Sequence, residues 1–274
     1  MGCYTICGSE RHARINFNES RRHPYVIPKL RTCILTAVCL TVSLGAHAQS
    51  SEAMQLMEAT NQDRAEHGLG PLRWDPALAR AAQAHAYEMV RHGELSHQYA
   101  DEPDLMTRAG HDGAHFSTVA ENVAVAPNPQ SVESEWMHSP PHRHNILDPR
   151  LTTVGIGLVR QGNNLWAVED FSAAVVQMGS SQIEQKVEQM VAERGIHSVT
   201  ASGAARQTCA MDHGFVGTRP NFIMRWEGSD LNRLPDVLEE KIRTGRYRTA
   251  AVGACSSGNR GQGFTSYRMA VLLF

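Results

Sequence analysis

Apolar residues recur with helical spacing in three stretches between residue 52 and residue 139. The spacing predicts a helix over 52–67 and an alanine-rich helix over 76–92, which Asp75-Pro76 opens with a capping side chain and a proline in the first turn. Asn128-Pro129 repeats that signature, and the helix that it starts must end at Ser139 because two prolines follow. The small side chains of the second helix allow a neighbouring element to approach closely.

The period of the pattern changes to two after residue 150. Apolar residues alternate along 151–160 and again along 164–171, which predicts two strands. Gly162-Asn163-Asn164 lies between them and is typical of a hairpin turn. Helices followed by an antiparallel pair of strands indicate an α+β sandwich over 49–175.

A second, smaller α+β module is expected over 176–274. A helix with one apolar face ends near Gly195, and a stretch rich in Gly, Ala and Ser follows. The other elements that the pattern predicts are a strand over 221–226, a helix over 235–244, and strands over 247–255 and 266–274.

The first 48 residues are expected to be a signal peptide. Lys29 and Arg31 precede an uncharged apolar run, and Ala46-His47-Ala48 offers a cleavage site that leaves Gln49 first. A transmembrane anchor is the alternative, but the run is short for a membrane span. The polar extension over 1–25 is unusual for a signal peptide and suggests that the true start codon lies further downstream. The sequence thus predicts a secreted or periplasmic protein without a membrane anchor in its mature form.

Export changes the interpretation of charge and of cysteine. Six of the 26 Lys and Arg and two of the 28 acidic residues precede residue 32, so the mature chain carries 20 basic and 26 acidic residues and is a poor partner for nucleic acid. Four of the six cysteines fall in the signal peptide. Cys209 and Cys255 remain and are expected to form a disulfide, with a reactive thiol as the alternative.

Three side chains carry the candidate chemistry, namely His97 after the alanine-rich helix, Glu121, and His142 after the two prolines. Neutral imidazole is the commonest metal ligand, and two His plus one Glu could hold Zn²⁺ with a water molecule in the fourth position. Alternatively, Glu121 only hydrogen-bonds to an imidazole. A third interpretation is a structural network that orders the cleft without binding anything.

Several motifs occur together in one order. They are Asn61-x-x-Arg64, Leu72-x-Trp74-Asp75, Leu95-Ser96-His97, Glu121-Asn122-Val123-Ala124, Trp136-x-x-Ser139-Pro140-x-His142-Arg143-x-Asn145-Ile146-Leu147, Val154-Gly155-Ile156-Gly157 and Trp166-x-x-x-x-Phe171. Over residues 52–175 the chain resembles the bacterial branch of the CAP superfamily, the cysteine-rich secretory proteins, antigen 5 and pathogenesis-related 1 proteins, whose domain is also called SCP.

The resemblance implies a secreted three-layer αβα sandwich. Many CAP members place two His and two acidic residues in one cleft, and in some of them the two His bind a divalent metal. By position, His97 and His142 match the two histidines and Glu121 matches one acid. Ser139 stands where many members have the second acid, and Pro141 replaces the glycine that usually precedes this histidine.

The function expected is binding, outside the cytoplasm. The ligand cleft would comprise His97, Glu121, Ser139 and His142, with His97 and His142 holding a divalent metal such as Zn²⁺. The partner would be a small apolar molecule, a lipid, a peptide or a component of the cell envelope. One alternative is a metal-assisted peptidase with Glu121 as its candidate catalytic residue. Another is a non-catalytic protein-interaction module.

Overall fold

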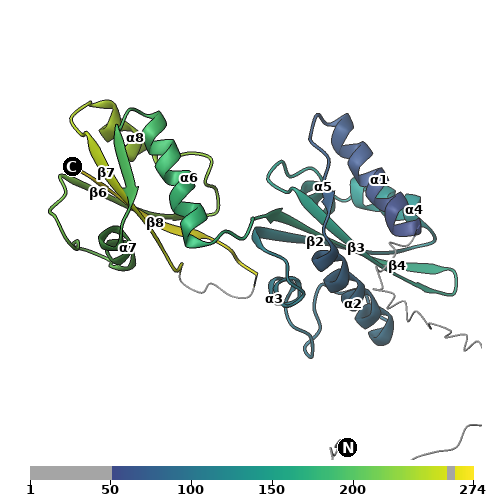
Figure 1. Ribbon diagram of the computed structural model, residues 1–274. Coiled ribbons are helices and arrows are strands. Elements are labelled where there is room, and N and C mark those ends of the chain that lie inside the picture. The colour runs from purple at the N-terminus through teal and green to yellow at the C-terminus, as the bar shows by residue number, and fades with distance from the viewer. Residues whose placement is uncertain (1–50, 258–262) are drawn as a thin grey trace, which may run out of the picture. The chain divides into compact units, whose positions relative to one another are not determined.

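The computed structural model describes residues 51–257 and 263–274, and these form two four-stranded sheets with helices on both faces of each (Figure 1). The predicted signal peptide lies outside the described residues. Within the described ranges, no helix is long and apolar enough to cross a membrane.

The first sheet has the strand order β1-β3-β4-β2. Its strands are β1 (Arg73–Trp74), β2 (Phe116–Ala126), β3 (Thr153–Gln161) and β4 (Asn164–Ala174). The predicted hairpin of β3 and β4 is confirmed: Gln161 pairs with Asn164, and Gly162 adopts the left-handed backbone conformation that such a tight turn requires. The sequence pattern did not predict β2, although this strand pairs with β4 along almost its whole length.

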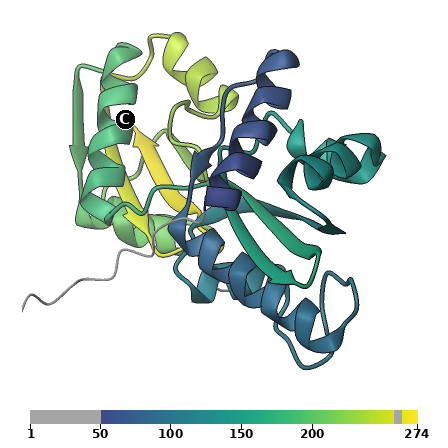
Figure 2. The same ribbon diagram turned by 90° about the vertical axis from the view of Figure 1, so that its right-hand side faces the viewer.

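Helices cover both faces of this sheet, as Figure 2 shows for α1 and α2. Those preceding β3 are α1 (Ser51–Glu66), α2 (Pro76–His92), α3 (Leu105–His111), α4 (Pro129–His138) and α5 (Pro140–Ile146). Apolar side chains of α2 pack on one face, and those of α1, α4 and α5 pack on the other. The predicted three-layer αβα arrangement is therefore confirmed.

The alanine-rich helix α2 lies unusually close to β3. A methyl group added at Gly155 would lie 2.1 Å from the Ala79 nitrogen, and one at Gly157 would lie 2.2 Å from the Ala82 carbonyl carbon. Both distances are far below van der Waals contact, so only glycine fits at these two strand positions. A close approach of another element to the small residues of α2 was predicted. The structure shows that this element is β3, which approaches at Gly155 and Gly157.

Arg64 ties α1 to the loops that flank the sheet. Its buried guanidinium group donates hydrogen bonds to four backbone carbonyls, those of Gly70, Ile146, Asp148 and Leu151. Asn61, one turn earlier, donates to the Leu72 carbonyl and accepts from the Leu72 nitrogen. Both residues hold segments of irregular backbone in place, because buried carbonyl groups need donors.

The second sheet has the order β5-β7-β8-β6. Its strands are β5 (Ser198–Ala201), β6 (Phe222–Gly228), β7 (Thr249–Cys255) and β8 (Tyr267–Leu273), and its helices are α6 (Ser180–Glu193), α7 (Gly203–Ala210) and α8 (Asp236–Arg243). Helices α6 and α8 share one apolar core with the sheet, and α7 packs in a separate cluster. The predicted Cys209–Cys255 disulfide is confirmed and joins α7 to the end of β7.

Candidate functional site

The candidate site is built on β2, where successive side chains point to opposite faces of the sheet. Glu121 lies opposite Asp170 of β4, and the next residue, Asn122, lies opposite Glu169. Glu121 and Asp170 therefore share one face of the sheet, and Asn122 and Glu169 share the other. All four side chains are buried.

His97 and Glu121, two of the predicted site residues, are in direct contact. The His97 Nδ1 atom lies 2.9 Å from Glu121 Oε1. Because an ionised carboxylate only accepts hydrogen bonds, Nδ1 carries a proton, and in the neutral ring the lone pair of Nε2 is free. The hydrogen bond to Glu121 raises the pKa of His97 above its usual value. The His97 side chain is 59% exposed, so its free nitrogen is accessible from solvent.

Arg108 of α3 occupies the other oxygen of Glu121. It donates to Glu121 Oε2, and it also donates to the backbone carbonyls of His97 and Pro103. One buried cation thus fixes both the carboxylate and the loop that carries His97. With both oxygens engaged, Glu121 fits the role of an orienting partner of the imidazole better than that of a metal ligand.

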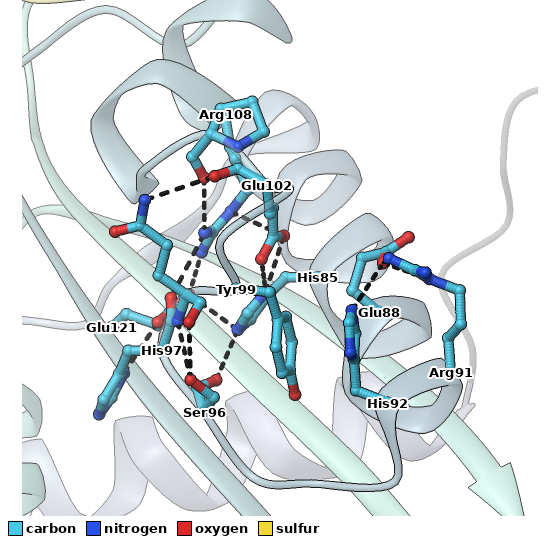
Figure 3. A network of polar contacts seen from close by, with 12 residues as sticks. His85, Glu88, Arg91, His92, Ser96, His97, Tyr99, Glu102, Arg108 and Glu121 are labelled. Carbon is cyan, nitrogen blue, oxygen red and sulfur yellow. Dashed lines mark hydrogen bonds and ion pairs between the residues drawn. The ribbon is translucent and has the colours of Figure 1, made fainter.

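A second buried pair lies beside Arg108, and Figure 3 shows the whole network. His85 of α2 places Nδ1 at 2.8 Å from Glu102 Oε1 and Nε2 at 2.8 Å from the Ser96 carbonyl oxygen. The carbonyl oxygen can only accept a hydrogen bond, so Nε2 is the donor there. A second proton therefore lies between Nδ1 and the Glu102 carboxyl group. These hydrogen bonds hold the segment that carries His97 against α2.

His142 lies in α5, which two asparagines attach to β2. Asn122 Nδ2 donates to the His142 carbonyl oxygen at 3.3 Å, and Asn145 Nδ2 donates to the carbonyl oxygen of Glu121 at 3.2 Å. Burial lowers the pKa of His142, and the nearby charge of His97 adds to the effect. His142 is therefore a neutral imidazole near neutral pH, which is the form that binds metals.

Ser139 and Pro141 flank the start of α5. The prediction that a helix ends before the two prolines is confirmed, but the sequence did not predict that a new helix begins on Pro140. Proline suits the first turn of a helix because the amide it lacks would have no partner there. Pro141 thus lies in the first turn of α5. Within the described residues, the Ser139 side chain makes no capping hydrogen bond at the start of α5.

The site offers few side chains that could bind a metal ion. Among the described residues, no three His, Cys, Asp or Glu side chains are grouped so that they could hold a metal ion. Two imidazoles remain, with Glu121 orienting one of them. A cavity of about 390 Å³ lies next to α5 and is lined by Met137, His138, Pro140, Arg143, His144 and Leu147, which include none of the predicted cleft residues.

Sequence reasoning missed the polar residues that surround Glu121 in the structure. Arg108 and Glu102 lie in a segment without a clear periodic pattern, and Asp170 falls in a strand where alternation alone does not identify a partner. His85 could have been found, because it sits on the apolar face of α2 between buried alanines. A lone polar residue on such a face must find a partner when buried.

The first sheet and its helices match a known protein family. Residues 57–171 match the family model for CAP, the cysteine-rich secretory protein family. This part of the chain is a CAP domain. The predicted resemblance is confirmed, and the match includes His97, Glu121 and His142.

Two curated proteins of Bacillus subtilis and one solved structure are similar to the CAP domain. The Bacillus subtilis (strain 168) protein YkwD is 32% identical over 130 residues, which are 46% of this chain and 49% of YkwD. The membrane protein YlbC of the same organism is 30% identical over 115 residues, 41% of this chain and 33% of YlbC. A solved extracellular SCP-domain protein from Bacillus anthracis is 25% identical with a TM-score of 0.42, covering 44% of this chain and 40% of that one. The chain therefore matches half or less of each of these proteins.

Proposed function

We propose that this is an exported CAP-domain protein that binds a divalent metal ion through His97 and His142, and holds a small apolar or peptide ligand at that ion. The observation that carries the proposal is the hydrogen bond between Glu121 and His97 Nδ1. In the neutral ring, it leaves the lone pair of Nε2 available to bind a metal ion at an exposed position. The lowered pKa of His142 supplies a second neutral imidazole. The predicted signal peptide supports a location outside the cytoplasm.

Two imidazoles leave coordination positions open on a bound divalent ion such as Zn²⁺. Water or a ligand carbonyl would fill these positions, which suits reversible binding. Hydrolysis would require a free general base, and Glu121 is occupied by Arg108 and His97. The geometry therefore favours binding over the peptidase alternative.

The test is zinc binding to purified residues 49–274 by calorimetry at pH 7.5. The expected result is one zinc ion per chain, lost or weakened at least about tenfold in His97→Ala and in His142→Ala. The matched control is His138→Ala, which removes an exposed histidine from the neighbouring helix and should leave the affinity unchanged. Absence of zinc binding, or an equal loss in the control variant, would contradict the proposal.

A further inference from the structure

The two parts of the mature chain differ in charge. Residues 49–175 hold eight Lys and Arg against 17 Asp and Glu, whereas residues 176–274 hold 12 against nine. The contrast increases along the sequence, because residues 241–274 contain six Lys and Arg and no acidic residue. The excess of acid in the mature chain therefore conceals a basic region in its second part.

Four of these basic residues lie within eight positions, where α8 ends and the chain turns into β7 (Figure 1). We call this group the basic turn, and its members are Lys241, Arg243, Arg246 and Arg248. All four are exposed, and within the described residues none of their side chains forms an ion pair. Glu239, which lines a hollow together with Arg243, already binds Arg194 at 3.0 Å. The positive charge of the basic turn is thus not matched by ion pairs within this part of the fold.

Hydrogen bonds fix the backbone of the basic turn. Gly245 adopts the left-handed conformation that commonly ends a helix. The Thr244 hydroxyl group donates to the Lys241 carbonyl oxygen at 2.7 Å and accepts from the Arg246 nitrogen at 3.4 Å. Tyr247 packs against the apolar core between two exposed arginines. The fold therefore presents the cations together on an ordered, exposed turn.

Helix electrostatics explain only part of this group. Cations are favourable at the C-terminal end of a helix, and Lys241 and Arg243 lie in the last turn of α8. Arg246 and Arg248 lie beyond the helix, where this effect is lost. Because like charges at close range repel one another, the two further cations do not stabilise the turn. A partner outside the chain would account for them.

We propose that the basic turn docks residues 176–274 on a membrane surface that carries anionic phospholipid. An exposed turn suits an extended surface better than a small ligand, which needs a concave site. Anionic headgroups attract clustered Lys and Arg without a pocket. Val237, one turn before Lys241 on α8, is 51% exposed and places an apolar side chain beside the charges. The predicted export would bring the chain to such a surface, and the docking does not depend on a metal at His97 and His142.

The test is co-sedimentation of residues 49–274 with phospholipid vesicles at low salt. A chelator is present so that no metal ion bridges protein and lipid. The chain is expected to bind vesicles of equal parts phosphatidylcholine and phosphatidylglycerol, and not vesicles of phosphatidylcholine alone. Binding should weaken as the salt concentration rises, because salt screens exposed charges. Equal binding to both kinds of vesicle, or binding to neither, would overturn the proposal.

Charge variants identify the surface that binds. Replacing Arg246 and Arg248 by Gln should weaken vesicle binding about thirtyfold, since each cation near an anionic surface contributes about fivefold. Replacing the same two residues by Lys keeps the charge and should leave binding unchanged. The matched control replaces Arg73 and Arg233 by Gln, which removes the same charge from two exposed positions outside the basic turn. An equal loss in this control would show that only the net charge matters and would contradict the proposal.

A soluble anion separates a lipid surface from other phosphate-bearing partners. Val237→Ser should weaken binding to the mixed vesicles and leave binding to inorganic polyphosphate unchanged, because only a bilayer has an apolar interior. A chain that binds polyphosphate but not the mixed vesicles would overturn the assignment to a lipid surface. Zinc binding is measured separately on the same proteins and should be unchanged in the Gln variant, so the proposed function and this docking surface can fail independently.

Discussion

At the scale of single residues, Gly157 shows how strictly the contact of α2 with β3 limits the sequence. A Cβ atom at this position would lie within 2.4 Å of three backbone atoms of Ala82 and Gln83. Backbone atoms cannot rotate away as a flexible side chain would, so Gly157→Ala should force α2 off the sheet. We expect the free energy of unfolding to fall by about 3 kcal/mol, at the upper end of overpacking costs.

Urea denaturation of Gly157→Ala measures this effect, and Gly70→Ala is its control. Gly70 has nothing within 4 Å of an added Cβ, and its backbone is not left-handed. The control should therefore stay within about 0.5 kcal/mol of the wild type. A Gly157→Ala protein as stable as the Gly70→Ala protein would show that the helix is not held this closely.

The sequence was informative about residues with a local signature and silent about those defined by a distant partner. Asp75 and Asn128 were predicted as caps, and each accepts a backbone hydrogen bond in the first turn of its helix. The positions of Arg108 and Asp170 beside Glu121 could not be predicted, because they depend on which segments the fold brings next to β2. His97 and Glu121 were found through motifs, which carry that spatial information implicitly.

At the scale of elements, α1, α4 and β4 meet around one buried hydroxyl group. Thr60 Oγ1 lies 2.9 Å from Glu133 Oε2 and 2.9 Å from Glu169 Oε1. One hydroxyl group has a single proton to give, so at least one of the two carboxyl groups must carry a proton and donate to Thr60. Burial raises the pKa of Glu133 to about 8 and, together with the charge of Glu133, raises that of Glu169.

This arrangement predicts a loss of stability as the pH rises. Between the usual pKa of 4.5 and the raised value of about 8, the folded chain keeps a proton on Glu133 that the unfolded chain releases. The free energy of unfolding should therefore fall from pH 5 to pH 8, by up to about 1.4 kcal/mol per pH unit for each proton. Urea denaturation at pH 5, 6.5 and 8 measures the slope.

Glu133→Gln removes this titration and should flatten the slope. The matched control is Glu135→Gln, which changes an exposed acid on the same helix and should retain the wild-type slope. A wild-type stability that rises from pH 5 to pH 8, or the same slope in the Glu133→Gln protein, would contradict the interpretation.

Elements with a strong periodic pattern were predicted, and those built from small or mixed residues were not. The predicted α2 and the β3–β4 hairpin agree with the structure to within a few residues. Strand β5 and helix α7 were missed because the stretch that forms them is rich in small residues and lacks a clear apolar period, and its Gly and Ser residues favour loops. In the structure, Gly253 of β7 lies close to the backbone of Ala205, so the small residues of α7 serve close packing instead.

At the scale of the whole molecule, the Cys209–Cys255 disulfide links two cysteines 46 positions apart, one in α7 and one at the end of β7. Around it, Ala205, Ala270 and Leu272 form a small buried cluster in the second sheet. A cluster of this size contributes little burial, so the covalent link should supply much of the stability of that face. The loop-closure argument puts the contribution at about 4 kcal/mol.

The proposed division of the chain near residue 175 predicts which part of the chain would lose stability without the disulfide. Replacing both cysteines by alanine should speed amide hydrogen exchange in β5 to β8 and leave the amides of β2 to β4 almost unchanged, because the two sheets have separate hydrophobic cores. Zinc titration should likewise be unaffected, since His97 and His142 belong to the CAP domain. Equal acceleration in both sheets would instead mean that residues 51–274 unfold as one cooperative unit.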